Sequence, residues 1–584
     1  MVTRRDFLSL MAGGTAVGLL RSNALEALEV NPRASQEHPN VILIITDDQG
    51  YGDLGCHGNP LIRTPHLDRL HAQSTRLTNF HVDPLCSPTR AALMTGRYSC
   101  RAGVWATIRG RSLLRRDEIT MADVFAASGY RTGIFGKWHL GDNYPYRPQD
   151  RGFQEVLVHG GGGVGQTPDF WGNDYFDDTY WHNGQPQKFE GYCTDVFFDA
   201  ALKFMEANRD RPFFVYLPTN APHSPYNVPD EYAEPYRQQG VPEQRARFYG
   251  MITNIDENVG RLLARLEEWN LEESTILIFL TDNGTSGGYN PRTGEGYNAG
   301  MRGKKGSAYE GGHRVPCFIR WPGRLPQGRD ITRLTAHFDL LPTLIECCGL
   351  RKPESVQFDG LSLVPLLTGN PANWPDRTLF VHTQQIEYPQ KWRECAVMTE
   401  RWRLVKGKEL YDLTADPGQR SNVAEQYPEE VWRLRQAYED WWADVSPRFD
   451  EYCPIVIGSE KENPLRLTAH DWHGETVPWN QRHINDDRLY PNGFWAIEVA
   501  QAGHYEFTLC RWPKEANRPI DATKARLKIG EVEVTKPIPE GATGVTFEVE
   551  LKAGSTRLQT WLLNEQTGRS RGAYFVYVRY IPPG

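Results

Sequence analysis

Short, continuous runs of apolar residues recur along the first half of the chain, each bounded by polar and turn-forming residues. Such runs, rich in β-branched residues, are typical of strands in a parallel sheet that is covered on both faces. The runs occupy residues 40–45, 130–135, 213–217 and 275–280. Apolar residues at helical spacing over 246–269 predict a long crossover helix. This alternation predicts an α/β fold with a mostly parallel central sheet flanked by helices.

The pattern changes near residue 375, where short alternating runs replace the continuous ones. Runs at 379–382, 395–398 and 402–405, followed by a helix at about 429–442, predict a smaller α+β subdomain. Beyond residue 450 the chain alternates apolar and polar residues between turn clusters, which predicts an appended β-sandwich-like domain. The expected divisions are 38–375, 376–448 and 450–584.

The N-terminus carries an arginine pair, Arg4-Arg5, followed by an apolar stretch over residues 10–20. This stretch is too short to cross a bilayer. Together they predict a twin-arginine signal peptide over residues 1–24, with small residues before a cleavage site after Ala24. No later segment is apolar for 18 residues, so we expect no membrane span in the mature chain and a periplasmic or secreted protein.

Composition narrows the function classes. The 584 residues are 39% hydrophobic, which is enough for sizeable cores, and carry a net charge of −8. That charge gives no support to a polycationic, nucleic-acid-binding protein. The ten cysteines include no CxxC pair that would suggest zinc, and their pairing is left open.

Polar residues of catalytic type follow each predicted strand. Because ligands bind at the carboxyl ends of strands in open α/β sheets, these endings predict one convergent site. The endings are Asp47-Asp48, Lys137-Trp138-His139, the Asn220-to-His223 stretch and Asp282-Asn283.

The acidic endings supply only oxygen ligands: Asp47, Asp48, Asp282 and Asn283. Three converging carboxylates would repel one another without a cation. A hard divalent ion resolves this repulsion, and Ca²⁺ fits the set, with Mg²⁺ as the alternative. A zinc site would more naturally include histidine or cysteine.

The segment from Pro84 to Arg97 contains a cysteine at a predicted helix start. Pro88 suits the first turn of a helix, so Cys86 lies near an N-terminus that favours negative charge. These features make Cys86 a candidate nucleophile and a neighbour of the metal. A bare thiolate is a poor partner for a hard cation, so an oxygen-bearing group is expected there.

The motif Cys86-x-Pro88-x-Arg90, with Leu-Met-Thr-Gly at 93–96, resembles the signature of the type I sulfatases, within the alkaline phosphatase superfamily. The resemblance covers roughly residues 38–445. Further matching stretches are 129–139, in which Phe135 is bulkier than expected, 220–225, 281–284, 303–312 and 410–417.

The resemblance implies a mechanism. Cys86 would be oxidised to formylglycine by a formylglycine-generating enzyme before export, and its hydrate would attack sulfur and join the four metal ligands. Arg90 would orient this group, and Lys137 and Lys305 would neutralise the sulfate oxygens. His223 would protonate the leaving alcohol, and His139 would act as the base that releases sulfate.

We expect the substrate to be a sulfated saccharide, with an aryl sulfate as a surrogate. The loop over 159–183 is a candidate pocket rim, and Arg101, Arg109 and Arg111 are candidate partners for a second anionic group. Two alternatives stay open. One is a phosphoester or phosphonate monoester hydrolase of the same superfamily, and the other is a glycan-binding protein with an inactive catalytic domain.

Overall fold

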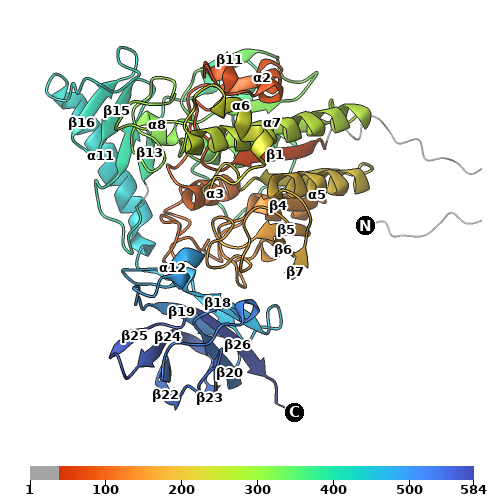
Figure 1. Ribbon diagram of the computed structural model, residues 1–584. Helices are drawn as coiled ribbons and strands as arrows, with labels where there is room; N and C mark the ends of the chain where they lie inside the picture. Colours follow the sequence, from red (N-terminus) through yellow and green to blue (C-terminus); the bar gives the residue numbers. More distant parts are fainter. Residues whose placement is uncertain (1–37, 383, 584) are drawn as a thin grey trace, which may run out of the picture.

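The computed structural model describes residues 38–382 and 384–583 (Figure 1), so the predicted signal peptide lies outside the described residues. Its largest element is a ten-stranded sheet in the order β11-β2-β10-β9-β1-β8-β4-β5-β6-β7. The strands are β1 (Asn40–Thr46), β2 (Thr75–Leu77), β4 (Arg131–Lys137), β5 (Glu155–His159), β6 (Thr179–His182), β7 (Gln185–Lys188), β8 (Phe213–Pro218), β9 (Thr275–Thr281), β10 (Cys317–Arg320) and β11 (Arg329–Ile331).

The centre of this sheet is parallel, as predicted. Strand β1 pairs in parallel with β8 and β9, and β4 pairs in parallel with β8 and β5. Antiparallel pairs occur toward the edges, between β10 and its neighbours and among β5, β6 and β7. The four predicted strands are confirmed, and the crossover helix is α7 (Glu243–Glu268), which begins slightly earlier than expected.

Strand β1 explains why the continuous apolar run indicates burial on both faces. All seven of its residues are buried. Val41, Leu43 and Ile45 pack into one hydrophobic cluster, with α3 (Cys86–Thr95) and α4 (Met121–Ala127). Ile42 and Ile44 point to the opposite face, where α5 (Cys193–Ala207) and α7 pack. Because successive side chains of a strand alternate, only an uninterrupted apolar run satisfies both layers.

The predicted α+β segment forms a four-stranded antiparallel sheet beside the large one. Its strands are β13 (Leu379–His382), β14 (Cys395–Met398), β15 (Trp402–Val405) and β16 (Glu409–Asp412). Helix α11 (Pro428–Val445) packs its apolar face on this sheet through Leu434, Tyr438 and Trp441.

The C-terminal region consists of two β-sheets that share one hydrophobic core, at the bottom of Figure 1. One sheet contains β17 (Ile455–Ile457), β19 (Phe494–Val499), β21 (Lys524–Ile529), β22 (Val532–Pro537), β24 (Gly554–Asn564) and β25 (Arg569–Arg571). The other contains β18 (Leu465–Thr468), β20 (Gly503–Cys510), β23 (Val545–Leu551) and β26 (Phe575–Ile581). The predicted all-β character is confirmed, while the exact domain boundaries stay a prediction.

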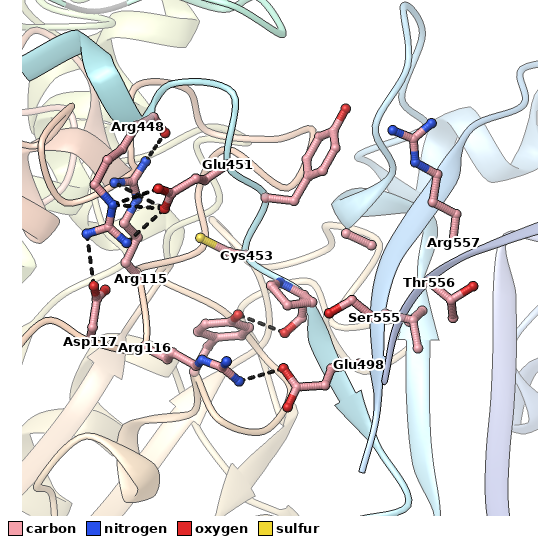
Figure 2. Close-up of a pocket in the computed structure, with 15 residues that line it drawn as sticks. Arg115, Arg116, Asp117, Arg448, Glu451, Cys453, Glu498, Ser555, Thr556 and Arg557 are labelled. Carbon is pink, nitrogen blue, oxygen red and sulfur yellow. Dashed lines mark hydrogen bonds and ion pairs between the residues drawn. The ribbon is translucent and has the colours of Figure 1, made fainter. Parts of the chain in front are cut away.

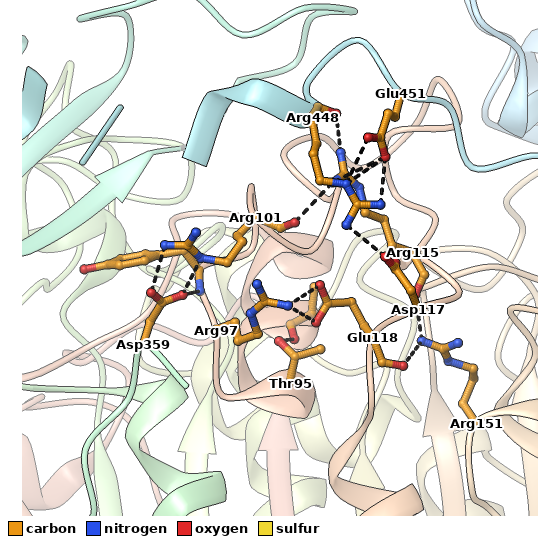
Figure 3. Close-up of polar contacts among 12 residues, drawn as sticks. Thr95, Arg97, Arg101, Arg115, Asp117, Glu118, Arg151, Asp359, Arg448 and Glu451 are labelled. Carbon is orange, nitrogen blue, oxygen red and sulfur yellow. Dashed lines mark hydrogen bonds and ion pairs between the residues drawn. The ribbon is translucent and has the colours of Figure 1, made fainter. Parts of the chain in front are cut away.

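A crevice of about 720 Å³ lies between this region and the rest of the chain (Figure 2). Ion pairs line it: Arg116 contacts Glu498 at 2.6 Å, and Arg448 contacts Asp117 at 2.8 Å. Figure 3 shows that Arg97 and Arg101, close to the crevice in sequence, are also paired with carboxylates. Arg97, for example, contacts Glu118 at 2.8 Å. Exposed charge pairs therefore line the crevice, while beside it the buried Leu113 and Tyr146 pack into the core of the C-terminal region.

All ten cysteines are free thiols within the described residues. Across that same part of the chain, no helix has both the length and the apolar character needed to cross a membrane.

Candidate active site

Cys86 is the first residue of α3, as the sequence predicts, and is only 3% exposed. Burial raises the pKa of its thiol, and the nearby Lys137 and Lys305 ammonium groups offset this only in part. An unmodified Cys86 would therefore be mostly a neutral thiol at neutral pH. This agrees with the expectation that a different group supplies the nucleophile.

Strands β1 and β9 bring two carboxylates to this cysteine. Asp47, Cys86 and Asp282 are all buried, and each offers a ligand atom within 4.8 Å of the others. Asp47 Oδ2 also accepts a hydrogen bond from Lys137 Nζ, at the end of β4, over 2.6 Å. Four elements that are distant in the sequence thus meet at one edge of the sheet, as their polar endings predict.

Asp48 adopts a left-handed backbone conformation, with φ of 67°, which turns the chain sharply after β1. Its Oδ1 contacts Lys305 Nζ at 2.5 Å and accepts from Asn283 Nδ2 at 3.0 Å. Burial alone would raise the pKa of Asp48, but Lys305 and His223 outweigh it and hold that pKa well below its usual range. Asp48 is therefore a carboxylate at neutral pH.

Arg90 is fully buried and hydrogen-bonds to residues at the ends of β9 and β4. Its Nη2 donates to Asp282 Oδ2 at 2.8 Å, and its Nη1 donates to the Lys137 carbonyl at 3.1 Å. Burial and the charge of Asp47 raise the pKa of Asp282 to about 7. These two contacts of Arg90 therefore position Asp282 and the end of β4.

Two acceptor atoms in this cluster identify a place for a cation. Asp47 Oδ1 and Asn283 Oδ1 are buried and have no hydrogen-bond partner among the described residues. Buried polar atoms are normally satisfied, so these two are available to coordinate a bound cation. Since the donors are carboxylate and amide oxygens, the residues fit a hard divalent ion.

His139 has its two ring nitrogens in different surroundings. Its Nε2 lies 2.9 Å from the Thr107 carbonyl, which can only accept, so Nε2 carries the proton. Nδ1 is buried without a described partner and keeps its lone pair. Burial, with Lys137 and His470 nearby, lowers the pKa of His139 well below its ordinary value. The neutral ring therefore keeps Nδ1 unprotonated.

His223 follows β8 and is the more accessible of the two histidines. Its Nδ1 donates to the Ser224 carbonyl at 2.6 Å, and its Nε2 lies 3.9 Å from Asp48 Oδ2. Burial lowers the pKa of His223 to about 4, although Asp48 opposes this. His223 is therefore neutral at neutral pH before substrate binds.

The glycine-rich stretch after β5 packs directly on these histidines. A Cβ atom on Gly162 would lie 2.1 Å from His139 Cε1, and one on Gly163 would lie 3.3 Å from His223 Nδ1. Asp169, whose carboxylate accepts from the Gly165 and Gly160 amides, holds the loop in place. The loop is therefore part of the site, and its glycines allow the close approach.

The C-terminal β-region adds residues that were not predicted for the site. The imidazole of His470 lies 5.9 Å from that of His139, measured between ring centroids. The Trp479 carbonyl accepts from the Thr167 amide at 3.0 Å, which ties the region to the glycine-rich loop. The only sequence signal was the His-Asp-Trp-His run at 470–473, which interrupts a segment of alternating strands.

The candidate arginines for a second anionic group have partners within the protein. Arg101 contacts Asp359 at 3.0 Å and also Asp444, and the first of these pairs is visible in Figure 3. Arg111 contacts Glu387 at 3.2 Å, and Arg109 Nη1 donates to the Gly474 carbonyl at 3.2 Å. These contacts join loops of the protein. Each of the three arginines therefore already has a partner within the chain.

The fold and the site together define a class. A central parallel sheet with carboxylates, lysines and histidines gathered at its strand ends is the arrangement of hydrolases in the alkaline phosphatase superfamily. The similarities to known proteins identify the family within it.

The chain belongs to the sulfatase family: the model of that family matches residues 39–350. A second model, N-sulphoglucosamine sulphohydrolase, C-terminal, matches residues 303–439. Human arylsulfatase A is 34% identical over 415 residues, which cover 65% of this chain and 77% of that protein. Dog N-acetylgalactosamine-6-sulfatase is 31% identical over 382 residues, covering 61% and 71%.

A solved structure is also similar. Ps i-CgsB in complex with k-i-k-neocarrahexaose has 27% identity and a TM-score of 0.64, covering 71% of this chain and 95% of that chain. The predicted sulfatase resemblance and fold are thereby confirmed, and the chain is a sulfuric ester hydrolase. Both family models end before the C-terminal β-region.

Proposed function

We propose that this chain is an exported sulfatase that removes sulfate from saccharides, with a formylglycine made from Cys86 and a bound Ca²⁺ ion. One observation supports the metal most directly: Asp47 Oδ1 and Asn283 Oδ1 are buried acceptors without described partners, beside Asp282 and Cys86. The signal peptide and the formylglycine-generating enzyme are parts of the same proposal, and both rest on the sequence motifs.

The metal would be held by Asp47, Asp48, Asp282 and Asn283, together with the modified Cys86. In that position Cys86 Sγ stands for an oxygen of the formylglycine hydrate. The bound ion would polarise the sulfate and favour ionisation of the attacking hydroxyl. Mg²⁺ remains the alternative, since it takes the same oxygen ligands with a stricter octahedral geometry.

The cationic side chains have defined tasks in this proposal. Lys137 and Lys305 would place their ammonium groups against sulfate oxygens as charge develops there. Each now contacts a carboxylate, Lys137 at Asp47 and Lys305 at Asp48. Arg90, paired with Asp282, would keep the strand ends in register so that both ammonium groups stay aimed at one centre.

The two histidines divide the proton transfers. His139, with Nε2–H fixed on the Thr107 carbonyl, would accept a proton at Nδ1 when sulfate is released. His223 would donate a proton to the leaving alcohol. Because its pKa is lowered to about 4, it must gain that proton when the anionic substrate binds. Because a general acid must be protonated to act, we expect the alkaline side of the pH–rate profile to report on His223.

The substrate assignment follows from relatives and from the site. The similar structure of Ps i-CgsB holds a carrahexaose, and N-acetylgalactosamine-6-sulfatase is named for a sulfated sugar. In this chain the glycine-rich loop packs on His139 and His223, and the C-terminal β-region reaches His139 through His470. Both observations favour a saccharide over a small aryl sulfate as the natural substrate.

Peptide mass spectrometry of active protein tests the nucleophile. We expect the Cys86 peptide to carry formylglycine, and we expect Cys86→Ala to lose at least about 10⁴-fold in kcat, as nucleophile removal does in other enzymes. Cys347→Ser, which alters a half-buried thiol elsewhere, is the matched control. An active sample in which Cys86 is entirely unmodified would contradict the mechanism.

A panel of defined sulfated saccharides, with matched sulfate and phosphate esters, tests the substrate. Faster hydrolysis of the sulfate esters supports the sulfatase assignment, whereas faster hydrolysis of the phosphate or phosphonate esters would favour the first alternative. Full glycan binding without hydrolysis by protein carrying formylglycine would favour the non-enzymatic alternative.

A further inference from the structure

A second cluster of metal-ligating side chains lies beside a cavity of about 320 Å³ at the β2–β10 side of the large sheet. Cys56 and His57 come from a short 3-10 helix, η1 (Gly55–His57), and His71 comes from α2 (Pro65–Ala72). Each of the three offers one ligand atom, and these atoms lie within 4.8 Å of one another. All three residues are partly exposed, so an ion could reach them from solvent.

His57 is held in the tautomer that metal binding requires. Its Nδ1 lies 2.7 Å from the Tyr51 carbonyl, which can only accept, so the proton is on Nδ1 and Nε2 keeps its lone pair. The Tyr51 ring stacks on the imidazole with centroids 3.9 Å apart. A ring nitrogen that donates to a backbone carbonyl while the other stays free is the usual outer-shell arrangement of metal-binding histidines.

His71 is fixed on the same cavity wall. Phe318 of β10 packs edge-on against it, with centroids 5.0 Å apart, and also against His57 at 5.8 Å. Burial and the Arg76 charge lower the pKa of His71, so its imidazole is neutral at neutral pH. Arg76 Nη1 lies 3.5 Å from His71 Nδ1, a long contact that leaves Nε2 of the ring for the cation, and Arg76 is also paired with Asp330 at 2.6 Å, which limits its repulsion of a bound cation.

Cys56 completes the set with a thiol that has no disulfide partner. Its backbone amide donates to Asp68 Oδ1 at 2.8 Å, and Asp68 lies one turn before His71 on α2. Burial, strengthened by the Asp68 charge, raises the pKa of the Cys56 thiol. The thiol is therefore protonated in the metal-free protein, and a bound cation would displace its proton.

We propose that Cys56, His57 and His71 form a second metal site, which binds one soft or borderline divalent cation of the Zn²⁺ class. Two imidazoles and a thiolate suit such an ion, whereas the all-oxygen set near Asp47 suits a hard one. Three protein ligands leave one tetrahedral position, open to the cavity, for a solvent molecule. Binding releases one proton, from the Cys56 thiol.

A third cluster of potential ligands shows why composition alone does not make a site. His81, Glu310 and His313 are also within ligand distance of one another. However, the two histidines share a hydrogen bond of 2.9 Å between their Nδ1 atoms, and Glu310 pairs with Arg403 at 2.6 Å. The two Nδ1 atoms are thus committed to each other and Glu310 is committed to Arg403, whereas Nε2 of His57 keeps its lone pair.

Cobalt and zinc binding to the tag-free, full-length protein tests the second site. All variants carry Cys86→Ala, so that the thiol of the candidate active site contributes nothing and the outcome is independent of sulfatase activity. With excess Ca²⁺ present, we expect Co²⁺ to give a thiolate-to-metal charge-transfer band, and elemental analysis to find about one Zn²⁺ per chain.

Cys56→Ser should abolish the band. His57→Gln and His71→Gln should each weaken Zn²⁺ binding by at least about 100-fold, because losing an outer-shell partner already costs about 10- to 100-fold. Cys347→Ser should change neither readout, and unchanged circular dichroism shows that a variant is folded. No charge-transfer band, or equal zinc content in the parent and all three ligand variants, would overturn the proposal.

Discussion

Two ion pairs in this protein have the same nitrogen–oxygen distance and opposite surroundings. Lys137 contacts Asp47 at 2.6 Å in the candidate active site, and both side chains are 0% exposed. Arg116 contacts Glu498 at 2.6 Å in the C-terminal crevice, where the two side chains are 55% and 28% exposed. Geometry alone would rank these pairs as equal.

Burial separates them. Removing one partner of a buried pair leaves an uncompensated charge, which costs about 3 to 5 kcal/mol, whereas an exposed pair contributes about 0 to 1 kcal/mol. The exposed crevice pair therefore contributes little to the junction, which also has Leu113 and Tyr146 buried in the core of the C-terminal region. The buried charges near β1 lower the stability of the fold. We expect them to be there because they bind a metal and an anionic substrate.

The largest expected effect is that of Lys137→Met. It leaves Asp47 buried without its ammonium partner, so in chelator the free energy of unfolding should fall by about 3 to 5 kcal/mol. Activity should fall by at least about 100-fold, because the variant also lacks a positive charge aimed at the sulfate. Denaturant unfolding with and without Ca²⁺ measures this, and a bound cation should reduce the stability loss. If the free energy of unfolding fell by less than 1 kcal/mol in chelator, the buried pair would be no stronger than the exposed one.

Gly162→Ala tests whether close packing, and not charge alone, distinguishes the active site. The added Cβ would lie 2.1 Å from His139 Cε1, so the ring must shift. We expect kcat to fall by more than about tenfold, because small displacements of a catalytic group are costly. Gly163→Ala, where the nearest atoms are 3.3 Å away, should cost less. Equal kcat values for both variants and the parent would contradict the assigned packing.

Asp169→Asn tests a buried carboxyl that holds the glycine-rich loop. Burial raises the pKa of Asp169 to about 7 from 3.8, so the folded protein binds its proton more tightly than the unfolded chain. Its contribution to stability is complete below pH 3.8 and is lost as pH rises toward 7. The fall in Tm between pH 5 and pH 8 should be a few degrees smaller in the variant. Asp440→Asn, on the exposed side of α11, should leave the profile unchanged.

The smallest expected effect is that of Arg116→Met in the crevice. Its pair with Glu498 is largely exposed, so the free energy of unfolding should change by less than about 1 kcal/mol, and less still at high salt. Saccharide hydrolysis should stay within about twofold of the parent. A loss as large as that of Lys137→Met would show that exposure does not separate the two ion pairs in energy.

The chain by itself determined the elements and the types of residue at the site. Periodicity predicted β1, β4, β8, β9 and α7 because a strand buried on both faces leaves an uninterrupted apolar run. The order of polar residues after these strands predicted the meeting of Asp47, Lys137 and Asp282, since parallel strands end at one edge. These are local patterns, and they need no knowledge of which distant side chains touch.

Only the tertiary structure decided the partners. In the folded protein Arg90 hydrogen-bonds to Asp282, and Gly162 packs on the His139 ring. His470, from the C-terminal β-region, lies beside the same histidine. The tertiary structure also gathered Cys56, His57 and His71 around one cavity. Such contacts join residues far apart in the chain, so they depend on how whole sheets and helices pack. No local pattern encodes that packing, whereas burial and hydrogen bonding in the folded protein specify it.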